Sequence, residues 1–323
     1  MKKHETKNRA LLILEYLWKS SDEGHPVTTS DILSHLSEYG IISTRKTIAC
    51  DIVELQELGI DIICNRRKQN EYFIGSRLLE PVEVKILMDA VQAAKFLSPQ
   101  KSVELINKLA VLSSEHQKET LKRSLRTERA KTSNNKVYYI VDNLFAAILK
   151  KQALSFQYLD YTAEGKRALK HDGQVYTLSP YDLVWNEDGY YIFGWSETHG
   201  KVVKFRVDRI CNQEESNATF HDPPDDYDIA SFCRSVFSMY DGKLYKVELK
   251  CENSTLPAVL DRFGENICVQ DVDQTHFKVL VDVYISSTFY AWVVSFGGKV
   301  EIHSPDKVVS YFSEFLDLFK QVS

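Results

Sequence analysis

A series of short β segments between residues 154 and 207 constrains the fold of this chain more than any other feature. The segments are rich in aromatic residues, and turn signals lie between them at 164–166, 186–189 and 198–200. Strands are therefore expected at 154–161, 174–178, 182–185, 190–195 and 201–207. About five short strands joined by tight turns favour a small barrel over an open sheet.

Two arginines, Arg206 and Arg209, lie at the end of the last expected strand. The same stretch supplies several aromatic side chains, namely Tyr181, Trp185, Tyr190, Tyr191 and Trp195. A guanidinium group binds phosphate through paired hydrogen bonds, and aromatic faces stack on bases. An aromatic-rich β segment is also typical of a packed core, so both interpretations stay open.

The alternation of side chains along a strand separates these residues further. If the last strand persists, Phe205 and Val207 fill the core while Arg206 points outward. Salt bridges to Asp208 or Asp182 are the alternative role of the two arginines. The aromatic residues expected to be structural are Trp185, Tyr191, Phe193 and Phe205.

The composition describes a soluble, multidomain chain. A length of 323 residues suits two or three domains, and 44% hydrophobic residues are enough for several cores. Because the formal net charge is -5, any binding of nucleic acid must come from local basic patches. The N-terminus lacks the apolar stretch of a signal peptide and no apolar run is long enough to span a membrane, so a cytoplasmic location is expected. The six cysteines are scattered, as expected of reduced thiols, and neither a disulfide framework nor a metal site is expected.

The first 78 residues are predicted to form a winged helix-turn-helix. Apolar residues at helical spacing indicate three helices, with Ser43 as the N-cap of the third and Gly59 at its end. Two short β runs, 60–64 and 71–74, then flank a polar turn with three consecutive cations. In such a module the second helix of the pair enters the major groove with its N-terminal residues.

Two groups of residues are therefore candidate DNA contacts. One group opens the third helix and consists of Ser43, Thr44, Arg45, Lys46 and Thr47. The other group forms the wing and consists of Arg66, Arg67 and Lys68. The alternative is that both groups are solvated surface charges.

The remaining regions complete a division into four parts. Residues 79–136 are expected to be a helical linker that either bridges subunits or acts as a spacer packed on its neighbours, and 137–220 contain a further helix and the β segments. Residues 221–323 follow an acidic stretch and show the order βαββαβ, which is typical of a ferredoxin-like domain. The predicted fold class is α+β and multidomain.

The β-rich stretch resembles the WYL-domain transcriptional regulators. The motifs that carry the resemblance are Pro180-Tyr181, Leu183-Val184, Gly189-Tyr-Tyr-Ile192, Gly194 and Phe205-Arg-Val-Asp-Arg-Ile210. The tail is similar to the family's C-terminal extension through Phe237-Ser-Met239, Asp261-Arg-Phe-Gly264, Trp292 and Ser304-Pro305. The resemblance implies an SH3-like (Sm-like) barrel, a ferredoxin-like extension and a homodimeric DNA-binding regulator whose WYL domain senses a nucleic acid or nucleotide.

Four residues match the family's ligand pocket: Tyr181, Arg206, Arg209 and, less closely, Ser179. Two positions depart from the family pattern. The naming tripeptide is Tyr190-Tyr191-Ile192, and Tyr176 stands where many members carry an arginine. One cation fewer implies a smaller or less charged ligand.

Enzyme motifs are missing from the sequence. There is no phosphate-binding GxxxxGKS/T, no GxSxG elbow and no HExxH, so no catalytic residue and no cofactor are expected. The leading hypothesis is a ligand-responsive regulator that binds double-stranded operator DNA as a homodimer. The alternative is an accessory protein that binds single-stranded nucleic acid without operator specificity, and a third interpretation is a nucleotide-processing enzyme.

Overall fold

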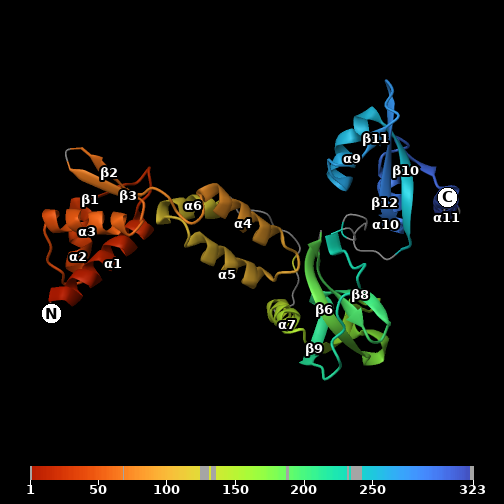
Figure 1. Cartoon of the computed structure of the whole chain (residues 1–323), viewed down its shortest axis with the longest axis horizontal. Helices are drawn as coiled ribbons and strands as arrows, with labels where there is room; N and C mark the ends of the chain where they lie inside the picture. Colours follow the sequence, from red (N-terminus) through yellow and green to blue (C-terminus); the bar gives the residue numbers. More distant parts are fainter. Residues whose placement is uncertain are drawn as a thin grey trace. The chain divides into compact units, whose positions relative to one another are not determined.

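The computed structural model describes residues 2–67, 69–123, 131, 136–186, 189–230, 233 and 242–320. The chain forms two compact units, Met1–Tyr139 and Ile140–Ser323, each of which is described by itself (Figure 1). Lys68, residues 124–130 and 132–135 of the expected linker 79–136, and the motif 237–239 lie outside the described residues.

The first unit begins with three helices and a small sheet. Its elements are α1 (Lys2–Ser20), β1 (Val27–Thr28), α2 (Thr29–Glu38), α3 (Arg45–Glu57), β2 (Ile62–Arg66) and β3 (Asn70–Ile74). The strands pair antiparallel in the order β1-β3-β2. A shared core contains Ile13 and Leu17 of α1, Ile32 and Leu36 of α2, and Ile48 and Ile52 of α3. The three predicted helices and the hairpin are confirmed.

Local capping sets where α2 and α3 begin and end. Thr28 caps α2 and exchanges hydrogen bonds with Asp31. The expected N-cap of α3, Ser43, is wrong: Thr44 is the last extended residue, and its hydroxyl accepts the Thr47 N–H at 3.3 Å. Gly59 follows α3 with φ of 90°, a conformation that favours glycine, so the predicted end of the helix is confirmed.

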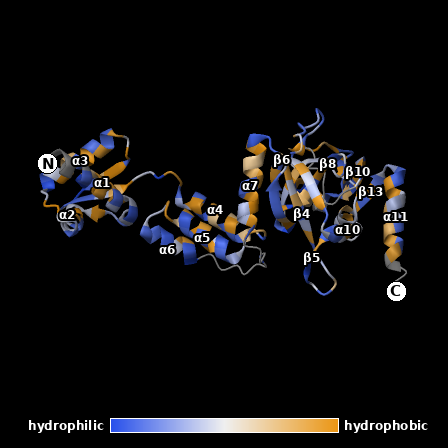
Figure 2. Ribbon diagram, turned by 90° about the horizontal axis from the view of Figure 1, so that it is seen from below, coloured by the Kyte–Doolittle hydropathy of each residue, from blue (hydrophilic) through white to orange (hydrophobic). Residues whose placement is uncertain are grey.

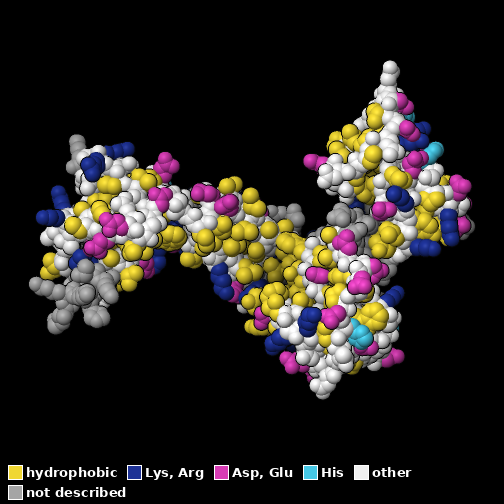
Figure 3. Space-filling model, in the orientation of Figure 1, with side chains coloured by type: hydrophobic (Ala, Val, Ile, Leu, Met, Phe, Trp, Pro, Cys, Tyr) yellow, Lys and Arg dark blue, Asp and Glu magenta, His cyan; other side chains and the backbone are white. Residues whose placement is uncertain are grey.

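Three further helices complete the first unit. They are α4 (Pro81–Ala93), α5 (Pro99–Ala110) and α6 (Glu115–Arg123). Proline occupies the first turn of α4 and of α5, where its missing N–H costs nothing. Val84, Met88, Ile106 and Leu121 are buried between them. Hydrophobic side chains nevertheless gather on the surface over α4 and α5 (Figure 3).

Most of α7 (Val137–Lys150) belongs to the second unit, and this helix is hydrophobic along much of its length (Figure 2). A curled sheet of six strands follows, in the order β5-β4-β6-β7-β8, with β9 pairing on β4. The strands are β4 (Leu154–Tyr161), β5 (Arg167–Leu169), β6 (Val175–Asn186), β7 (Gly189–Ser196), β8 (Lys201–Arg206) and β9 (Ile210–Glu215). Asn143 of α7 donates to Gln213 of β9 at 3.3 Å, so the helix lies on this strand.

The expected pair of strands at 174–178 and 182–185 is one strand, β6. The register with β7 shifts between Pro180 and Asp182, which is how a strand absorbs a proline without ending. Close pairing also explains Gly194 opposite Pro180, because a Cβ there would lie 2.2 Å from the Ser179 carbonyl oxygen. Strands β5 and β9 were not expected from the sequence.

The C-terminal part of the second unit is a four-stranded antiparallel sheet with three helices. Its elements are β10 (Leu244–Glu252), α9 (Leu256–Phe263), β11 (Val269–Gln270), β12 (His276–Tyr284), α10 (Ser287–Ser295), β13 (Val300–Ser304) and α11 (Asp306–Lys320). The sheet order is β11-β12-β10-β13. Val247, Leu249, Val283 and Phe289 are fully buried in its core. The predicted order of these elements is confirmed.

Two general observations complete the fold. No described helix combines the length and the apolar character needed to cross a membrane. None of the six cysteines, all of which are described, forms a disulfide.

Candidate functional site

The first turn of α3 presents two cations to solvent. Arg45 and Lys46 are exposed, and neither makes an ion pair within the described part of the chain. The hydroxyls of Thr44 and Thr47 lie 2.9 Å apart beside them. Lys and Arg side chains also lie over the hairpin end of β2 and β3 (Figure 3). This turn is therefore positively charged and free to contact an anion.

A partly buried ion pair holds α3 in place behind this turn. Arg9 of α1 donates to Asp51 with Nε–Oδ2 at 2.5 Å and Nη2–Oδ1 at 2.9 Å. The Arg9 side chain is 14% exposed and that of Asp51 is 2% exposed. Because a bidentate pair fixes both distance and orientation, α3 cannot rotate freely on the core.

The outward face of α3 carries residues that were not singled out from the sequence. Ile48, Asp51 and Ile52 point inward, so Cys50 and Val53 face outward beyond the basic turn, and both are exposed. Helical spacing of the buried positions is the signal that identifies them. Short side chains on this face allow close approach of a large partner.

The other expected DNA-contact residues differ in their surroundings. The Ser43 hydroxyl is buried and has no hydrogen-bond partner among the described residues. In the wing, Arg66 is exposed, while Arg67 Nη1 lies 3.7 Å from Glu71 Oε2. The structure therefore leaves Arg66 more available than Arg67, and Lys68 is outside the described residues.

In the second unit, Arg206 is half-buried at the end of β8. Its Nε lies 2.9 Å from Asp208 Oδ1 and its Nη2 lies 3.2 Å from Oδ2. Burial lowers the pKa of Arg206, but the hydrogen bond and charge of Asp208 outweigh it and raise the pKa overall. The backbone N–H of Arg206 donates to the Tyr158 hydroxyl at 3.1 Å. Burial raises the pKa of Tyr158 to about 12, so this phenol stays neutral.

Arg209 has a looser partner. Its Nη1 lies 3.6 Å from Asp160 Oδ1 of β4, and the two side chains are 35% and 44% exposed. The salt bridge to Asp208, which was the alternative role of the two arginines, is present for Arg206, whereas Asp182 accepts a hydrogen bond from the Tyr227 hydroxyl at 2.9 Å. Phe205 and Val207 are buried on either side of Arg206, as predicted.

Ser179 and Tyr181 are covered by the chain that follows β9. The backbone N–H of His221 donates to Ser179 Oγ at 3.0 Å. The Tyr181 hydroxyl donates to the Asp222 carbonyl at 3.1 Å. Both side chains are buried, with 2% and 7% exposure. We call residues 216–230 the connecting segment.

The four expected ligand residues thus form two groups. Ser179 pairs with Trp195 along β7, whereas Arg206 pairs with Tyr191, four residues away. Four residues of strand span about 13 Å. No hydrogen bond or ion pair among the described residues joins the two groups.

Tyr176, at the position where an arginine was considered, belongs to the core. It is 2% exposed, and its hydroxyl lies 2.7 Å from His171 Nδ1. Its ring stacks on His199, with centroids 6.0 Å apart and planes 4° apart. An aromatic cluster therefore takes the place of a cation at this position.

Comparison with known families agrees with this geometry. Residues 139–214 match the family model of the WYL domain. The chain contains a WYL domain. The tripeptide at the WYL position places Ile192 in the core with 0% exposure and leaves Tyr190 and Tyr191 partly exposed.

Two solved structures are similar to the whole chain. One is proteasome accessory factor B/C (PafBC) of Arthrobacter aurescens, with 15% identity and a TM-score of 0.29 over 95% of this chain and 45% of that chain. This chain thus spans less than half the length of that protein. The other is the crystal structure of a CRISPR Cas-related protein, with 11% identity and a TM-score of 0.39 over 98% and 83% of the two chains. No curated protein matches the chain.

The WYL domain also exposes two aromatic rings, one of which, Tyr161, was not singled out from the sequence. Trp185, expected to be structural, is 45% exposed, and Tyr161 is 55% exposed. The Arg167 guanidinium lies 5.9 Å from the centre of the Tyr161 ring. Such rings offer stacking surfaces. Among the described residues, no group of three or more His, Cys, Asp or Glu side chains could hold a metal ion.

Proposed function

We propose that this chain is a DNA-binding transcription regulator that acts as a homodimer and responds to a nucleic acid or nucleotide at its WYL domain. Arg45 and Lys46 at the start of α3 carry the proposal, because both are exposed and make no ion pair with any residue that the structure describes. With a net charge of -5, the chain as a whole repels DNA, so a local basic turn must supply the attraction.

The finer fold assignment belongs to the same proposal. The order of α1 to β3, with the sheet β1-β3-β2, supports a winged helix-turn-helix. The curled sheet with β9 returning to β4 supports an SH3-like barrel. The order β13-β10-β12-β11 supports a ferredoxin-like domain. Helices α4 to α6 then form the helical linker.

In this proposal α3 enters the major groove with its first turn. Arg45 and Lys46 contact phosphates or base edges, and Arg66 of the wing contacts the backbone. The Arg9–Asp51 pair supports the assignment because base reading needs a rigidly oriented helix. A dimer then binds two half-sites separated by about 34 Å per helical turn.

The exposed apolar surface of α4 and α5 supports a homodimer (Figure 3). Val82 and Ile86, one turn apart on α4, are 64% and 62% exposed, and Val103 of α5 is 60% exposed. Continuous apolar surface of this kind is stabilised by contact with a second copy. We assign the dimer contact to this face.

The WYL arginines suit an effector with negative charge. Asp208 forms an ion pair with Arg206, and Asp160 forms one with Arg209. An anionic effector must therefore replace a carboxylate. This exchange releases Asp208 or Asp160 and gives the liganded WYL domain a different arrangement of charges. An effector shifts the regulator only if it binds the two arrangements unequally.

Fluorescence anisotropy with the chain's own upstream DNA tests the proposal. The expected result is sequence-preferring binding that weakens steeply between about 50 and 200 mM salt. A scrambled duplex of the same length is the matched control. Equal affinity for the two duplexes, or no binding, would overturn the assignment.

A second candidate function is favoured by the exposed Trp185 and Tyr161 of the WYL domain. In this alternative the domain grips single-stranded nucleic acid by stacking, worth about 1–3 kcal/mol per base, and there is no operator. Tighter binding of a single strand than of any duplex favours it. Neither function assigns a catalytic residue, so nucleotides incubated with the protein should be recovered unchanged.

A further inference from the structure

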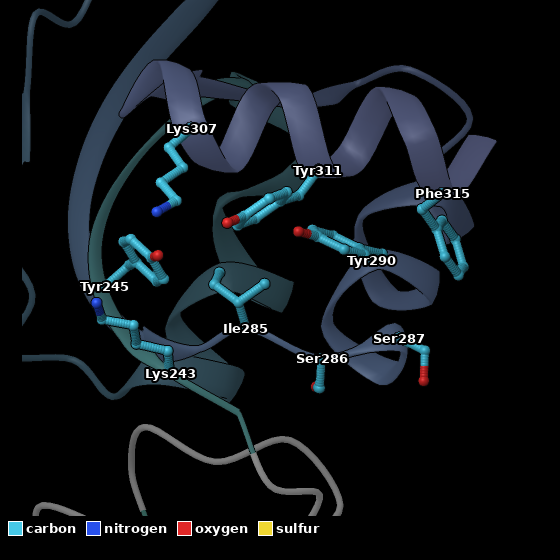
Figure 4. Close-up of a pocket in the computed structure, with 9 residues that line it drawn as sticks. All are labelled: Lys243, Tyr245, Ile285, Ser286, Ser287, Tyr290, Lys307, Tyr311 and Phe315. Carbon is cyan, nitrogen blue, oxygen red and sulfur yellow. The ribbon is translucent and has the colours of Figure 1, made fainter. Parts of the chain in front are cut away.

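A pocket of about 420 Å³ lies in the C-terminal part of the chain, formed entirely by residues 243–315. Strand β10 and the residue before it form one side, and α11 forms the other (Figure 4). The start of α10 supplies the floor with Ile285, Ser286 and Tyr290. A volume of this size is in the usual range for small-molecule sites, about 300–1,000 Å³.

Two lysines line the pocket from opposite sides. Lys307 Nζ of α11 lies 5.8 Å from the centre of the Tyr311 ring, and Tyr311 with the nearby Tyr245 raises the pKa of Lys307. Lys243 Nζ lies 5.7 Å from the centre of the Tyr245 ring. Both lysine side chains are therefore held beside phenol rings (Figure 4).

The N-terminal end of α10 adds to this positive character. Ser286 is its N-cap, and the Ser286 hydroxyl accepts the Phe289 N–H at 3.3 Å. The helix has 9 residues, and its positive dipole end lies at the pocket. Backbone N–H groups at such an end suit an anionic oxygen.

Tyr290 is the observation that points to a ligand. The residue is 6% exposed, and its hydroxyl is buried without a hydrogen-bond partner in the part of the chain that the structure describes. Figure 4 shows this hydroxyl directed into the pocket, near Tyr311 and Ile285. An unpaired buried hydroxyl is costly. Burial raises the pKa of Tyr290 to about 12, so the group is a neutral donor that lacks an acceptor.

The rest of the lining suits an aromatic group rather than a bare ion. Tyr311 is 38% exposed at the rim, and Ile285 and Phe315 provide apolar surface. Glu314 lies close enough to act on Tyr290, so one carboxylate opposes the two lysines. The balance of charge still favours an anion, and the aromatic surface adds selectivity for a ring.

We infer that this pocket binds a nucleotide-like small molecule, a phosphomonoester joined to an aromatic ring. Lys243, Lys307 and the start of α10 hold the phosphate, Tyr290 donates to it, and Tyr311 packs against the ring. The site is separate from Arg206 and Arg209 of the WYL domain. It goes beyond the proposed function, because the C-terminal part becomes a second ligand-binding module.

Isothermal titration of the full chain with the four ribonucleoside monophosphates tests the inference. At least one should bind, and the matching nucleoside and inorganic phosphate should each bind at least about tenfold more weakly, because charge-assisted hydrogen bonds and ring burial both contribute. Replacing both lysines, Lys243→Gln with Lys307→Gln, should weaken binding by about tenfold or more. The matched control is Lys246→Gln, on the opposite face of β10, which should bind like the unchanged chain.

Tyr290→Phe separates a ligand contact from a structural role. It should weaken nucleotide binding several-fold while leaving the melting temperature unchanged or higher, because the free chain loses an unpaired buried hydroxyl. Arg206→Ala removes the WYL contact, so binding that survives in Arg206→Ala and falls in the lysine variant belongs to this pocket. Four outcomes would overturn the inference: no nucleotide binding, inorganic phosphate binding as tightly as any nucleotide, an unchanged lysine variant, or an equal loss in Lys246→Gln.

Discussion

The cations at the start of α3 and those at the end of β8 differ in what already neutralises them. Arg45 and Lys46 are exposed and make no ion pair among the described residues. Arg206 and Arg209 each face an aspartate of their own domain. A free surface cation attracts any phosphate, while a paired arginine responds only to a ligand that can replace its carboxylate. In the proposed function, this difference distinguishes the cations of α3, which bind DNA, from the arginines of the WYL domain, which respond to an effector.

The contrast depends first on α3 being held rigidly. Asp51→Ala leaves the half-buried Arg9 without its partner and should destabilise the first unit by about 2–3 kcal/mol. Urea unfolding followed by circular dichroism measures the effect. Glu57→Ala, which removes an exposed acid at the end of the same helix, should change stability by less than about 0.5 kcal/mol. Equal effects would show that the ion pair does not fix α3.

Removing the free cations tests the binding side of the comparison. Arg45→Ala with Lys46→Ala should weaken operator binding by roughly 2 kcal/mol or more and lower the salt slope by about two, because two phosphate or base contacts are lost. Anisotropy at several salt concentrations measures both. The control is Lys108→Ala with Arg123→Ala, two exposed cations paired within α5 and α6. Unchanged affinity would move the DNA contacts elsewhere.

Removing a paired cation tests the sensing side. Arg206→Ala should weaken effector binding by about 1.5–3 kcal/mol and abolish the response, while the domain stays folded. Titration of effector against the operator complex and a thermal melt measure these two results. Lys201→Ala, at the start of the same strand, is the control. A response equal to that of the unchanged chain contradicts the assignment.

The capping of α3 gives a smaller effect. Thr44→Ala should cost about 1 kcal/mol, because the Thr47 N–H loses its acceptor. Ser43→Ala should be neutral or slightly stabilising, since the Ser43 hydroxyl is buried without a partner among the described residues. Chemical unfolding of both variants distinguishes the two positions. A larger loss of stability for Ser43→Ala than for Thr44→Ala would show that Ser43 caps α3, as expected from the sequence.

Removing the carboxylate that neutralises Arg206, in place of the arginine, should give the smallest loss of stability. Asp208→Asn should cost the WYL domain only about 0.2–1 kcal/mol, because the Arg206 side chain is 31% exposed and water screens the pair. The variant should bind an anionic effector several-fold more tightly, since Arg206 no longer has to release a carboxylate. Effector titration measures the change in affinity, and Lys201→Ala is again the control. Weaker binding would mean that Asp208 positions Arg206 for the effector.

The fold was predictable where the signal is local. Helical spacing and glycine positions indicated α1 to α3, and the order of elements from β10 to α11 followed from turn signals and alternation. The prediction was wrong near Pro180, where two separate strands were expected. The structure has one strand there, because pairing with β7 continues through a register shift beside the proline. Ser43 and Thr44 are equally good caps by type, and only backbone geometry chooses between them.

The sites were predictable only in part, because their neighbours are distant in sequence. Arg206 was expected to point outward and to have Asp208 within reach, and it does. The partner of Arg209 is Asp160 on β4, which no spacing rule brings to it. The cover over Tyr181 and the pocket around Tyr290 arise from segments that meet only in the folded chain.

The connecting segment has a consequence for how the chain is linked. Ser179 and Tyr181 are bonded to His221 and Asp222, in the same stretch that carries the chain from the WYL domain towards β10. A molecule that reaches Tyr181 has to displace the connecting segment from β6. The displaced residues then lengthen the free connection to the C-terminal part. Ligand entry at Tyr181 and the free length of the connecting segment therefore change together.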